Sequence, residues 1–82
     1  MRIEFVPSAA KDYQGLEQGI KSRIQRAFDA IFRDPDCGKP LQGPFRELRS
    51  YRVGDYRIVY KHEPQAFCVL IYRIGHRRDI YR

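Results

Sequence analysis

The sequence predicts an α+β fold in which two N-terminal helices pack on a mostly antiparallel sheet, in the order β-α-α-β-β-β. Apolar side chains recur at helical spacing only in the first half of the chain, over residues 20–33. Three runs rich in β-branched and aromatic residues fill the second half and are separated by short turns. Helices that precede a meander, instead of alternating with its strands, favour a two-layer arrangement.

The first strand and first helix are predicted at the N-terminus. Residues 2–6 alternate polar and apolar side chains and are closed by Pro7. Ser8 is the expected N-cap of a helix over residues 8–16. Its inner face would carry Ala9, Ala10, Tyr13 and Leu16. Gly15 and Gly19 are expected to bracket the turn that follows.

A second helix is predicted over residues 20–33, where Asp34-Pro35 ends it. Its apolar positions are Ile20, Ile24, Ala27, Phe28, Ile31 and Phe32. Its other face carries Lys21, Arg23, Arg26 and Arg33. We interpret this basic face as a solvated surface or one that faces a protein partner.

A Pro/Gly-rich connector over residues 34–44 leads into three strands, predicted over 46–53, 56–62 and 67–74. Gly54-Asp55 forms a tight turn and residues 63–65 a second hairpin loop. The third strand is apolar nearly throughout, which indicates a central strand buried on both faces and broken by Gly75. Alternation in the second strand places Arg57 opposite the core-facing Tyr56 and Ile58.

Length and charge limit the classes of function. With 82 residues we expect one domain over 1–82, which cannot hold both a core and a deep pocket, so the working surface should be a shallow groove or sheet face. The net charge is +6, and residues 46–82 contribute +5 of it. This balance indicates an anionic partner that meets the C-terminal half.

Several other classes are disfavoured. No apolar run approaches the roughly 20 residues that span a membrane, and the first residues lack the apolar core of a signal peptide. Cys37 and Cys68 show no Cys-x-x-Cys spacing and form no ligand cluster with His62 or His76. We therefore expect a cytoplasmic protein with no metal, no cofactor and no membrane partner.

Two motifs resemble a known family. The run LRSYRVGDYRIVY over residues 48–60 resembles the signature strand pair of the RelE/ParE toxin superfamily. The ending YRIGHRRDIY over residues 72–81 resembles its closing strand and tail. The resemblance covers essentially the whole chain. It implies a RelE-like two-layer fold and the toxin half of a type II toxin–antitoxin pair.

The resemblance also implies an activity and a set of site residues. RelE-type toxins cleave messenger RNA on the ribosome without a metal, by attack of a ribose 2′-hydroxyl on the adjacent phosphate. By position in the motifs, Arg57, Arg77 and Tyr81 would surround the scissile phosphate. The residues expected to bind RNA are Arg49, Arg52, Lys61, Arg73 and Arg78. Arginine suits this work because its planar donors match phosphate oxygens.

Proton transfer would fall to His76 or Tyr81, and Tyr81 could instead stack on a base. Each residue also has a simpler interpretation. His76 could be a hydrogen-bonded structural residue, Tyr81 could cover the core, and Arg57 could be a solvated strand residue that discourages edge pairing.

The leading hypothesis is therefore a ribosome-dependent endoribonuclease that inhibits translation. The alternative is a ParE-like inhibitor of DNA gyrase without nuclease activity, and a third possibility is an RNA-binding module without chemistry. The trio of Arg57, Arg77 and Tyr81 favours the nuclease. The expected partners are the ribosome, messenger RNA and an acidic RelB-like antitoxin in a hetero-oligomer.

Overall fold

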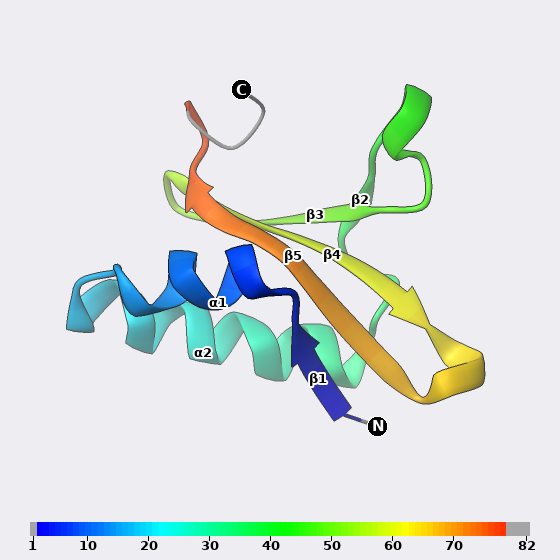
Figure 1. Cartoon of the computed structure of the whole chain (residues 1–82), viewed down its shortest axis with the longest axis horizontal. Coiled ribbons are helices and arrows are strands. Elements are labelled where there is room, and N and C mark those ends of the chain that lie inside the picture. The colour runs from blue at the N-terminus through cyan, green and yellow to red at the C-terminus, as the bar shows by residue number, and fades with distance from the viewer. Residues whose placement is uncertain (1, 79–82) are drawn as a thin grey trace.

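The computed structural model describes residues 2–78 and shows two helices covering one face of a five-stranded sheet (Figure 1). The elements are β1 (Arg2–Phe5), α1 (Pro7–Gln14), α2 (Gln18–Arg33), β2 (Lys39–Pro40), β3 (Arg49–Val53), β4 (Tyr56–Glu63) and β5 (Cys68–His76). The strand order is β1-β5-β4-β3-β2, with β1 parallel to β5 and every other pair antiparallel. The predicted α+β class, with helices on a mostly antiparallel sheet, is confirmed.

The start of α1 differs from the prediction. Pro7 is the first helical residue, Val6 is the N-cap, and no side chain caps the helix, so the assignment of Ser8 as N-cap is wrong. Proline is preorganised for the first helical position because its φ is fixed and the amide that it lacks would have no helical partner there. The preceding residue stays extended: the Val6 amide still donates to the Ile71 carbonyl of β5.

The turn between the helices lies earlier than predicted. α1 ends at Gln14 with Gly15 as its C-cap, and α2 already begins at Gln18, so Gly19 is helical. The amphipathic pattern of α2 is confirmed, since Ile24, Ala27 and Ile31 are buried. Phe32, predicted on the same face, is 40% exposed.

The connector contains a strand that the sequence pattern did not predict. Lys39 and Pro40 form β2, which pairs with Ser50 and Arg49 of β3. Proline is tolerated there because an edge strand has one side free of ladder hydrogen bonds. The strand predicted from residue 46 begins only at Arg49, because residues 43–45 form a 3₁₀ turn.

β5 also runs further than predicted. Gly75 does not break it, because Gly75 pairs with Arg57 and His76 pairs with Tyr56. The predicted central position is confirmed, since β5 lies between β1 and β4. Cys68 and Val69 are both buried although successive side chains point to opposite faces, so the start of this strand is covered on both sides.

The core lies between the helices and the sheet. β4 and β5 contribute Ile58, Tyr60, Val69, Ile71 and Ile74, and the helices contribute Ala9, Ile24, Ala27 and Ile31. Tyr60 was predicted as a core residue and is fully buried, whereas Tyr56 packs against the core at its margin. No helix among residues 2–78 is long and apolar enough to cross a membrane.

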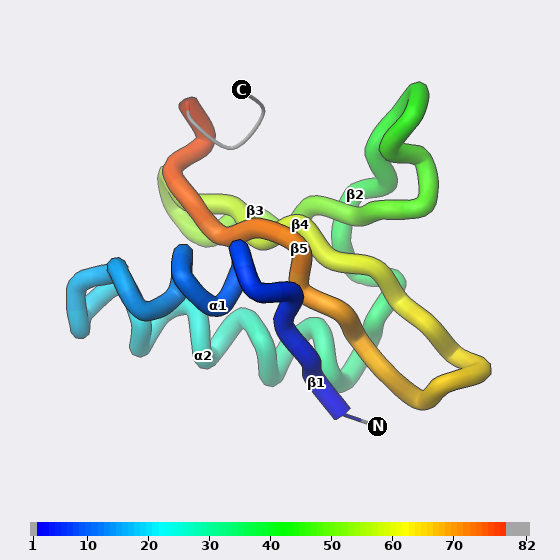
Figure 2. The backbone as a smooth tube through the Cα atoms, viewed as in Figure 1, coloured from blue at the N-terminus to red at the C-terminus, as the bar shows by residue number. Residues whose placement is uncertain are grey.

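The second face of the sheet is not covered by the helices. The segment that joins β2 to β3 rises on this side at one end, and residues 77–78 rise at the other (Figure 2). We call this side of the sheet the open face. Because Ile58 and Tyr60 are core residues, alternation puts Arg57, Val59 and Lys61 on the open face, as predicted. Val59 is nevertheless only 5% exposed.

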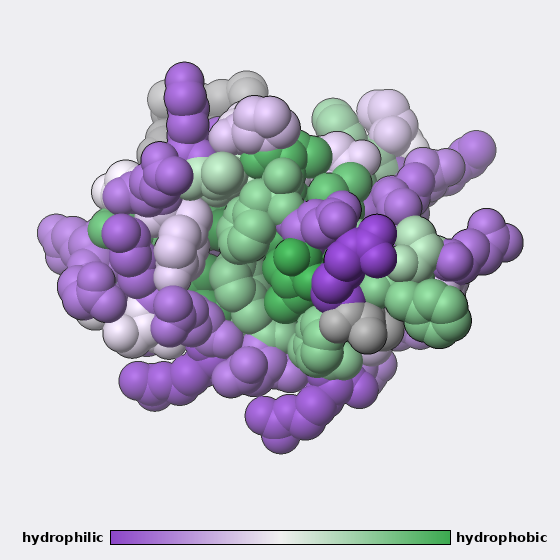
Figure 3. Space-filling model, turned by 60° about the horizontal axis from the view of Figure 1, so that its bottom comes forward, coloured by the Kyte–Doolittle hydropathy of each residue, from purple (hydrophilic) through white to green (hydrophobic). Residues whose placement is uncertain are grey.

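Apolar surface remains uncovered on the helical side. Figure 3 shows it in the middle of that side, ringed by hydrophilic side chains. Where β1, α1 and α2 meet, the centroid of the Phe5 ring lies 6.0 Å from that of the Tyr13 ring and 5.6 Å from that of the Phe28 ring. Phe5 stays 36% exposed. We call Phe5, Tyr13 and Phe28 the aromatic trio.

Candidate functional site

Two arginines stand directly opposite each other on the open face. Arg52 of β3 pairs with Arg57 of β4, and only the Val53–Tyr56 pair separates them from the two-residue turn at Gly54-Asp55. Side chains opposite each other in an antiparallel pair have Cβ atoms about 5 Å apart, and like charges in that position destabilise the sheet. No ion pair joins either guanidinium to a carboxylate within residues 2–78. A bound anion would relieve this repulsion.

Arg57 is held more firmly than a solvated strand residue. It is partly buried, and its Nη1 donates to Ser50 Oγ at 3.3 Å. Ser50 belongs to β3 and is only 4% exposed. A guanidinium fixed in this way needs little further ordering to bind an anion. Arg52 is exposed and its Nε donates to the Gly54 carbonyl at 3.0 Å.

The end of β5 lies beside this pair. Gly75 is the partner of Arg57 in the sheet. The Arg77 amide donates to the Asp55 carbonyl at 2.8 Å, so the backbone at Arg77 lies beside the β3–β4 turn. Arg77 and Arg78 are both exposed. The structure therefore brings Arg52, Arg57 and the Arg77 backbone to one end of the sheet. We call Arg52, Arg57 and Arg77 the open-face site. Tyr81 lies outside the described residues.

His76 takes a different direction. It pairs with Tyr56, and the two rings meet edge to face with centroids 5.7 Å apart. Tyr56 packs at the core margin, on the face opposite Arg57. His76 Nδ1 accepts a hydrogen bond from the Arg78 amide at 3.3 Å. The imidazole is thus beside the open-face site in sequence, but its ring turns to the other face.

Three of the residues predicted to bind RNA are engaged within the chain. Arg73 Nε donates to Asp12 Oδ2 of α1 at 3.1 Å. Lys61 lies 3.5 Å from Glu47 and 4.0 Å from Glu63. Their charges are therefore partly neutralised, unlike those of Arg52 and Arg57.

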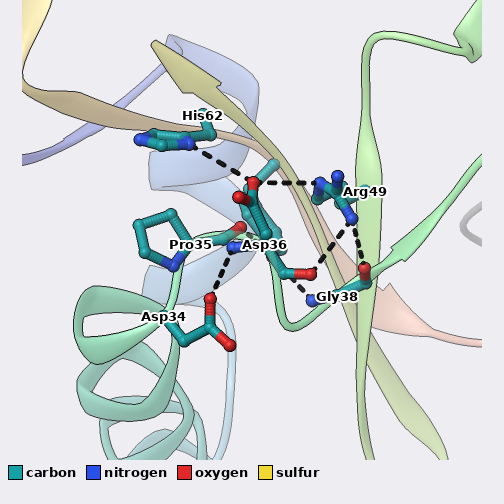
Figure 4. Close-up of polar contacts among 7 residues, drawn as sticks. Asp34, Pro35, Asp36, Gly38, Arg49 and His62 are labelled. Carbon is teal, nitrogen blue, oxygen red and sulfur yellow. Dashed lines mark hydrogen bonds and ion pairs between the residues drawn. The ribbon is translucent and has the colours of Figure 1, made fainter. Parts of the chain in front are cut away.

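Arg49 is the third, and it fastens the connector to the sheet (Figure 4). Its Nη1 donates to the carbonyls of Asp36, at 3.1 Å, and of Gly38, at 2.9 Å. The Asp36 carboxylate also lies 3.7 Å from Arg49 Nε and 3.5 Å from His62 Nδ1. These contacts give Arg49 and His62 a structural role beneath the segment that carries β2.

Tyr60 completes this attachment from within the core. Its hydroxyl donates to the Pro35 carbonyl at 2.7 Å and accepts from the Gly38 amide at 2.9 Å. Burial raises the pKa of the Tyr60 hydroxyl to about 12. Burial likewise raises the pKa of the Cys68 thiol.

Sequence reasoning missed two residues that support the site. Ser50 could have been found, because a two-residue turn fixes the hairpin register and places Ser50 on the same face as Arg52. Asp12 had no local signal. Its Oδ2 accepts from the Ile74 amide at 3.0 Å as well as from Arg73, at the part of β5 that lies beyond β1.

The chain closely matches known toxins in sequence and structure. Residues 3–81 match the family described as ParE toxin of type II toxin–antitoxin systems. Toxin RelG of Mycobacterium tuberculosis is 34% identical over 98% of this chain and 94% of its own length. Toxin RelE of the same organism is 33% identical over 98% of this chain and 84% of its own length.

A solved structure agrees with these relatives. The chain superimposes on the crystal structure of the M. tuberculosis toxin–antitoxin complex RelBE2 with a TM-score of 0.84 and 31% identity, over 95% of this chain and 92% of that one. The matched span includes both strands of the arginine pair. The chain therefore belongs to the RelE/ParE superfamily and is the toxin of a type II toxin–antitoxin system.

Proposed function

We propose that this toxin is a ribosome-dependent endoribonuclease that cleaves messenger RNA in the cytoplasm and so stops translation. The observation that carries the proposal is the Arg52–Arg57 pair, two like charges held opposite each other on an exposed sheet face beside Arg77. This arrangement suits a phosphate in a polymer, because an open face admits a strand that a closed pocket would exclude. The relatives named RelG and RelE support the same activity.

The reaction needs no metal in this scheme. The 2′-oxygen attacks the adjacent phosphorus while the P–O5′ bond breaks, which leaves a 2′,3′-cyclic phosphate and a free 5′-hydroxyl. Negative charge grows on the phosphorane oxygens. Arg57, fixed by Ser50, and Arg77 would donate to these oxygens, and electrostatic stabilisation of this kind is usually the largest catalytic contribution.

Two protons must move: one leaves the 2′-hydroxyl and one reaches the departing 5′-oxygen. His76 and Tyr81 remain the candidate groups. The His76 ring contacts Tyr56 on the face opposite Arg57, which favours Tyr81. Tyr81 would also be able to stack on a base next to the cleaved bond.

The partner of the free toxin is proposed to be an acidic, RelB-like antitoxin that forms a hetero-oligomer with it. The RelBE2 structure is a toxin–antitoxin complex of a relative with the same fold. The net charge of +6 favours an acidic partner. Antitoxin contacts are expected on the aromatic trio and on the arginines of the open face.

Induction of the toxin alone in growing bacteria tests the activity. Pulse labelling should show protein synthesis falling before DNA synthesis. Purified toxin added to ribosomes programmed with a defined messenger RNA should then yield discrete cleavage products by primer extension. If DNA synthesis stops first and gyrase-dependent breaks accumulate while messenger RNA on the ribosomes stays intact, the gyrase inhibitor is the correct function.

A further inference from the structure

A basic hollow lies beside the edge of β3 and is distinct from the open face. It has a volume of about 250 Å³ and lies between α2 and β3. Its lining residues are Arg23, Arg26, Ala27, Tyr51, Arg52 and Val53. Three arginines and no acidic residue line it, which sets up a positive potential in a concave surface.

Two of these arginines lie against the β3–β4 turn. Gly54 has a φ of 59°, which glycine adopts readily, and a side chain there would collide with the Arg23 guanidinium. Arg52 Nε donates to the Gly54 carbonyl. Arg23 and Arg26 are exposed and three residues apart, so their side chains neighbour each other on α2.

Several basic side chains elsewhere are matched by acids. Arg73 pairs with Asp12, Lys61 with Glu47 and Glu63, and Arg49 with Asp36. Within residues 2–78, no ion pair involves Arg23, Arg26, Arg52 or Arg57. Among the described residues, charge without an ion pair therefore continues from the open face over the β3 edge onto α2, whereas Arg73 of β5 is neutralised by Asp12.

We propose that Arg23 and Arg26 bind backbone phosphates of the substrate RNA. The RNA strand would then run from the open-face site across the edge of β3 to α2. This inference rests on the proposed function. Arg52 connects the hollow to the open-face site, because it lines the hollow and also lies opposite Arg57. A single strand held at Arg57 would meet Arg52 and then the two α2 arginines. Arg23 and Arg26 would thus have a nucleic-acid role within the basic face of α2.

Salt dependence of ribosome binding tests the proposal. The probe is a ribosome programmed with messenger RNA that carries a 2′-deoxynucleotide at the cleavage position, so that binding is measured without cleavage. Each lost phosphate contact on a single strand lowers the slope of log affinity against log salt by about 0.7. The double variant R23A/R26A should therefore lower the slope by about 1.4.

Matched variants control for charge and for folding. K11A/R33A removes one exposed cation from α1 and one from α2, neither of which lines the hollow, and should leave the slope unchanged. R23K/R26K keeps both charges and should retain the wild-type slope. The messenger RNA is then truncated on one or the other side of the cleavage position. One truncation should abolish the difference between wild type and R23A/R26A.

The outcomes separate this inference from the proposed function. If wild type neither binds nor cleaves on programmed ribosomes, the proposed function fails and the inference fails with it. If wild type binds and cleaves but R23A/R26A keeps the full slope, only the inference is wrong. It is also overturned if neither truncation abolishes the difference, which would assign the arginines to ribosomal RNA. Weakened binding of an acidic antitoxin with an unchanged ribosome slope would assign the hollow to that protein.

Discussion

Arg57 should be needed for cleavage but not for folding. Arg57→Ala removes a guanidinium that donates a hydrogen bond to Ser50 and is repelled by Arg52. Loss of the hydrogen bond lowers the stability, whereas relief of the repulsion raises it. We expect the free energy of unfolding to change by less than about 1 kcal/mol. Single-turnover cleavage on programmed ribosomes should fall about a hundredfold or more. Normal cleavage by this variant would make Arg57 a structural strand residue.

His76 can be tested with a substitution that preserves its ring contact. His76→Phe keeps an aromatic ring against Tyr56 but cannot transfer a proton. Because the ring faces away from Arg57, we expect cleavage within a few fold of wild type and an unchanged pH profile. A large loss of cleavage, together with the disappearance of one limb of the pH profile, would instead identify His76 as the proton-transfer group.

Tyr60 should give the fold a distinct sensitivity to alkaline pH. The pKa of the Tyr60 hydroxyl is raised to about 12, against about 10 in an unfolded chain, so the hydroxyl stays protonated to a higher pH in the folded state. The resulting stability is fully present below pH 10 and is lost as pH rises towards 12. Urea unfolding should show that the difference in stability between wild type and Tyr60→Phe narrows across this window. A difference in stability that stays constant over this pH range would contradict the prediction.

At the scale of elements, the connector is held by close contact between its own Gly38 and Tyr60 of β4. A Cβ on Gly38 would lie 2.5 Å from Tyr60 Oη, which also bonds the Gly38 amide. Gly38→Ala should therefore destabilise the fold by about 1–3 kcal/mol and loosen the pairing of β2 with β3. Gly19→Ala is the control, since nothing lies within 4 Å of its Cβ position and alanine favours a helix. Equal unfolding midpoints for the two variants would disprove the steric argument.

Local patterns predicted those elements whose periodicity is strong. The apolar spacing of α2 and the alternation of β4 gave the correct buried faces, including Ile24, Ile58 and Tyr60. β2 was missed because its two residues, Lys39 and Pro40, carry no strand pattern and are held through Arg49 by tertiary contacts. The continuation of β5 through Gly75 was missed for a related reason: pairing with Arg57 compensates for the weak strand propensity of glycine.

At the scale of the whole molecule, charge was predictable but its distribution in space was not. The sequence shows that residues 46–82 hold most of the excess positive charge. Which cations are neutralised depends on distant acids, as with Asp12 and Arg73, which are 61 residues apart. For the same reason Arg23 and Arg26, in the nearly neutral half, join the basic surface only in the folded molecule. The Arg52–Arg57 pair likewise depends on the register of β3 against β4, which the sequence analysis did not specify.

The exposed arginines and the aromatic trio lie on different surfaces, and we expect them to affect different rate constants of antitoxin binding. Exposed arginines at the end of the sheet should accelerate encounter with an acidic antitoxin, while the aromatic trio should hold the complex once formed. We expect the association rate to fall steeply between low and high salt and the dissociation rate to change little.

Two variants assign these contributions to their surfaces. Arg77→Ala with Arg78→Ala removes exposed charge without apolar contact, so it should slow association and weaken its salt dependence. Phe5→Ala removes a 36% exposed ring of the trio, so it should speed dissociation and leave the salt dependence intact. The thermal midpoint of Phe5→Ala shows whether the free toxin is still folded at the assay temperature. If the dissociation rate carries most of the salt dependence, or if Phe5→Ala slows only association, the two surfaces do not divide the work in this way, and the complex is instead held by buried charge pairs.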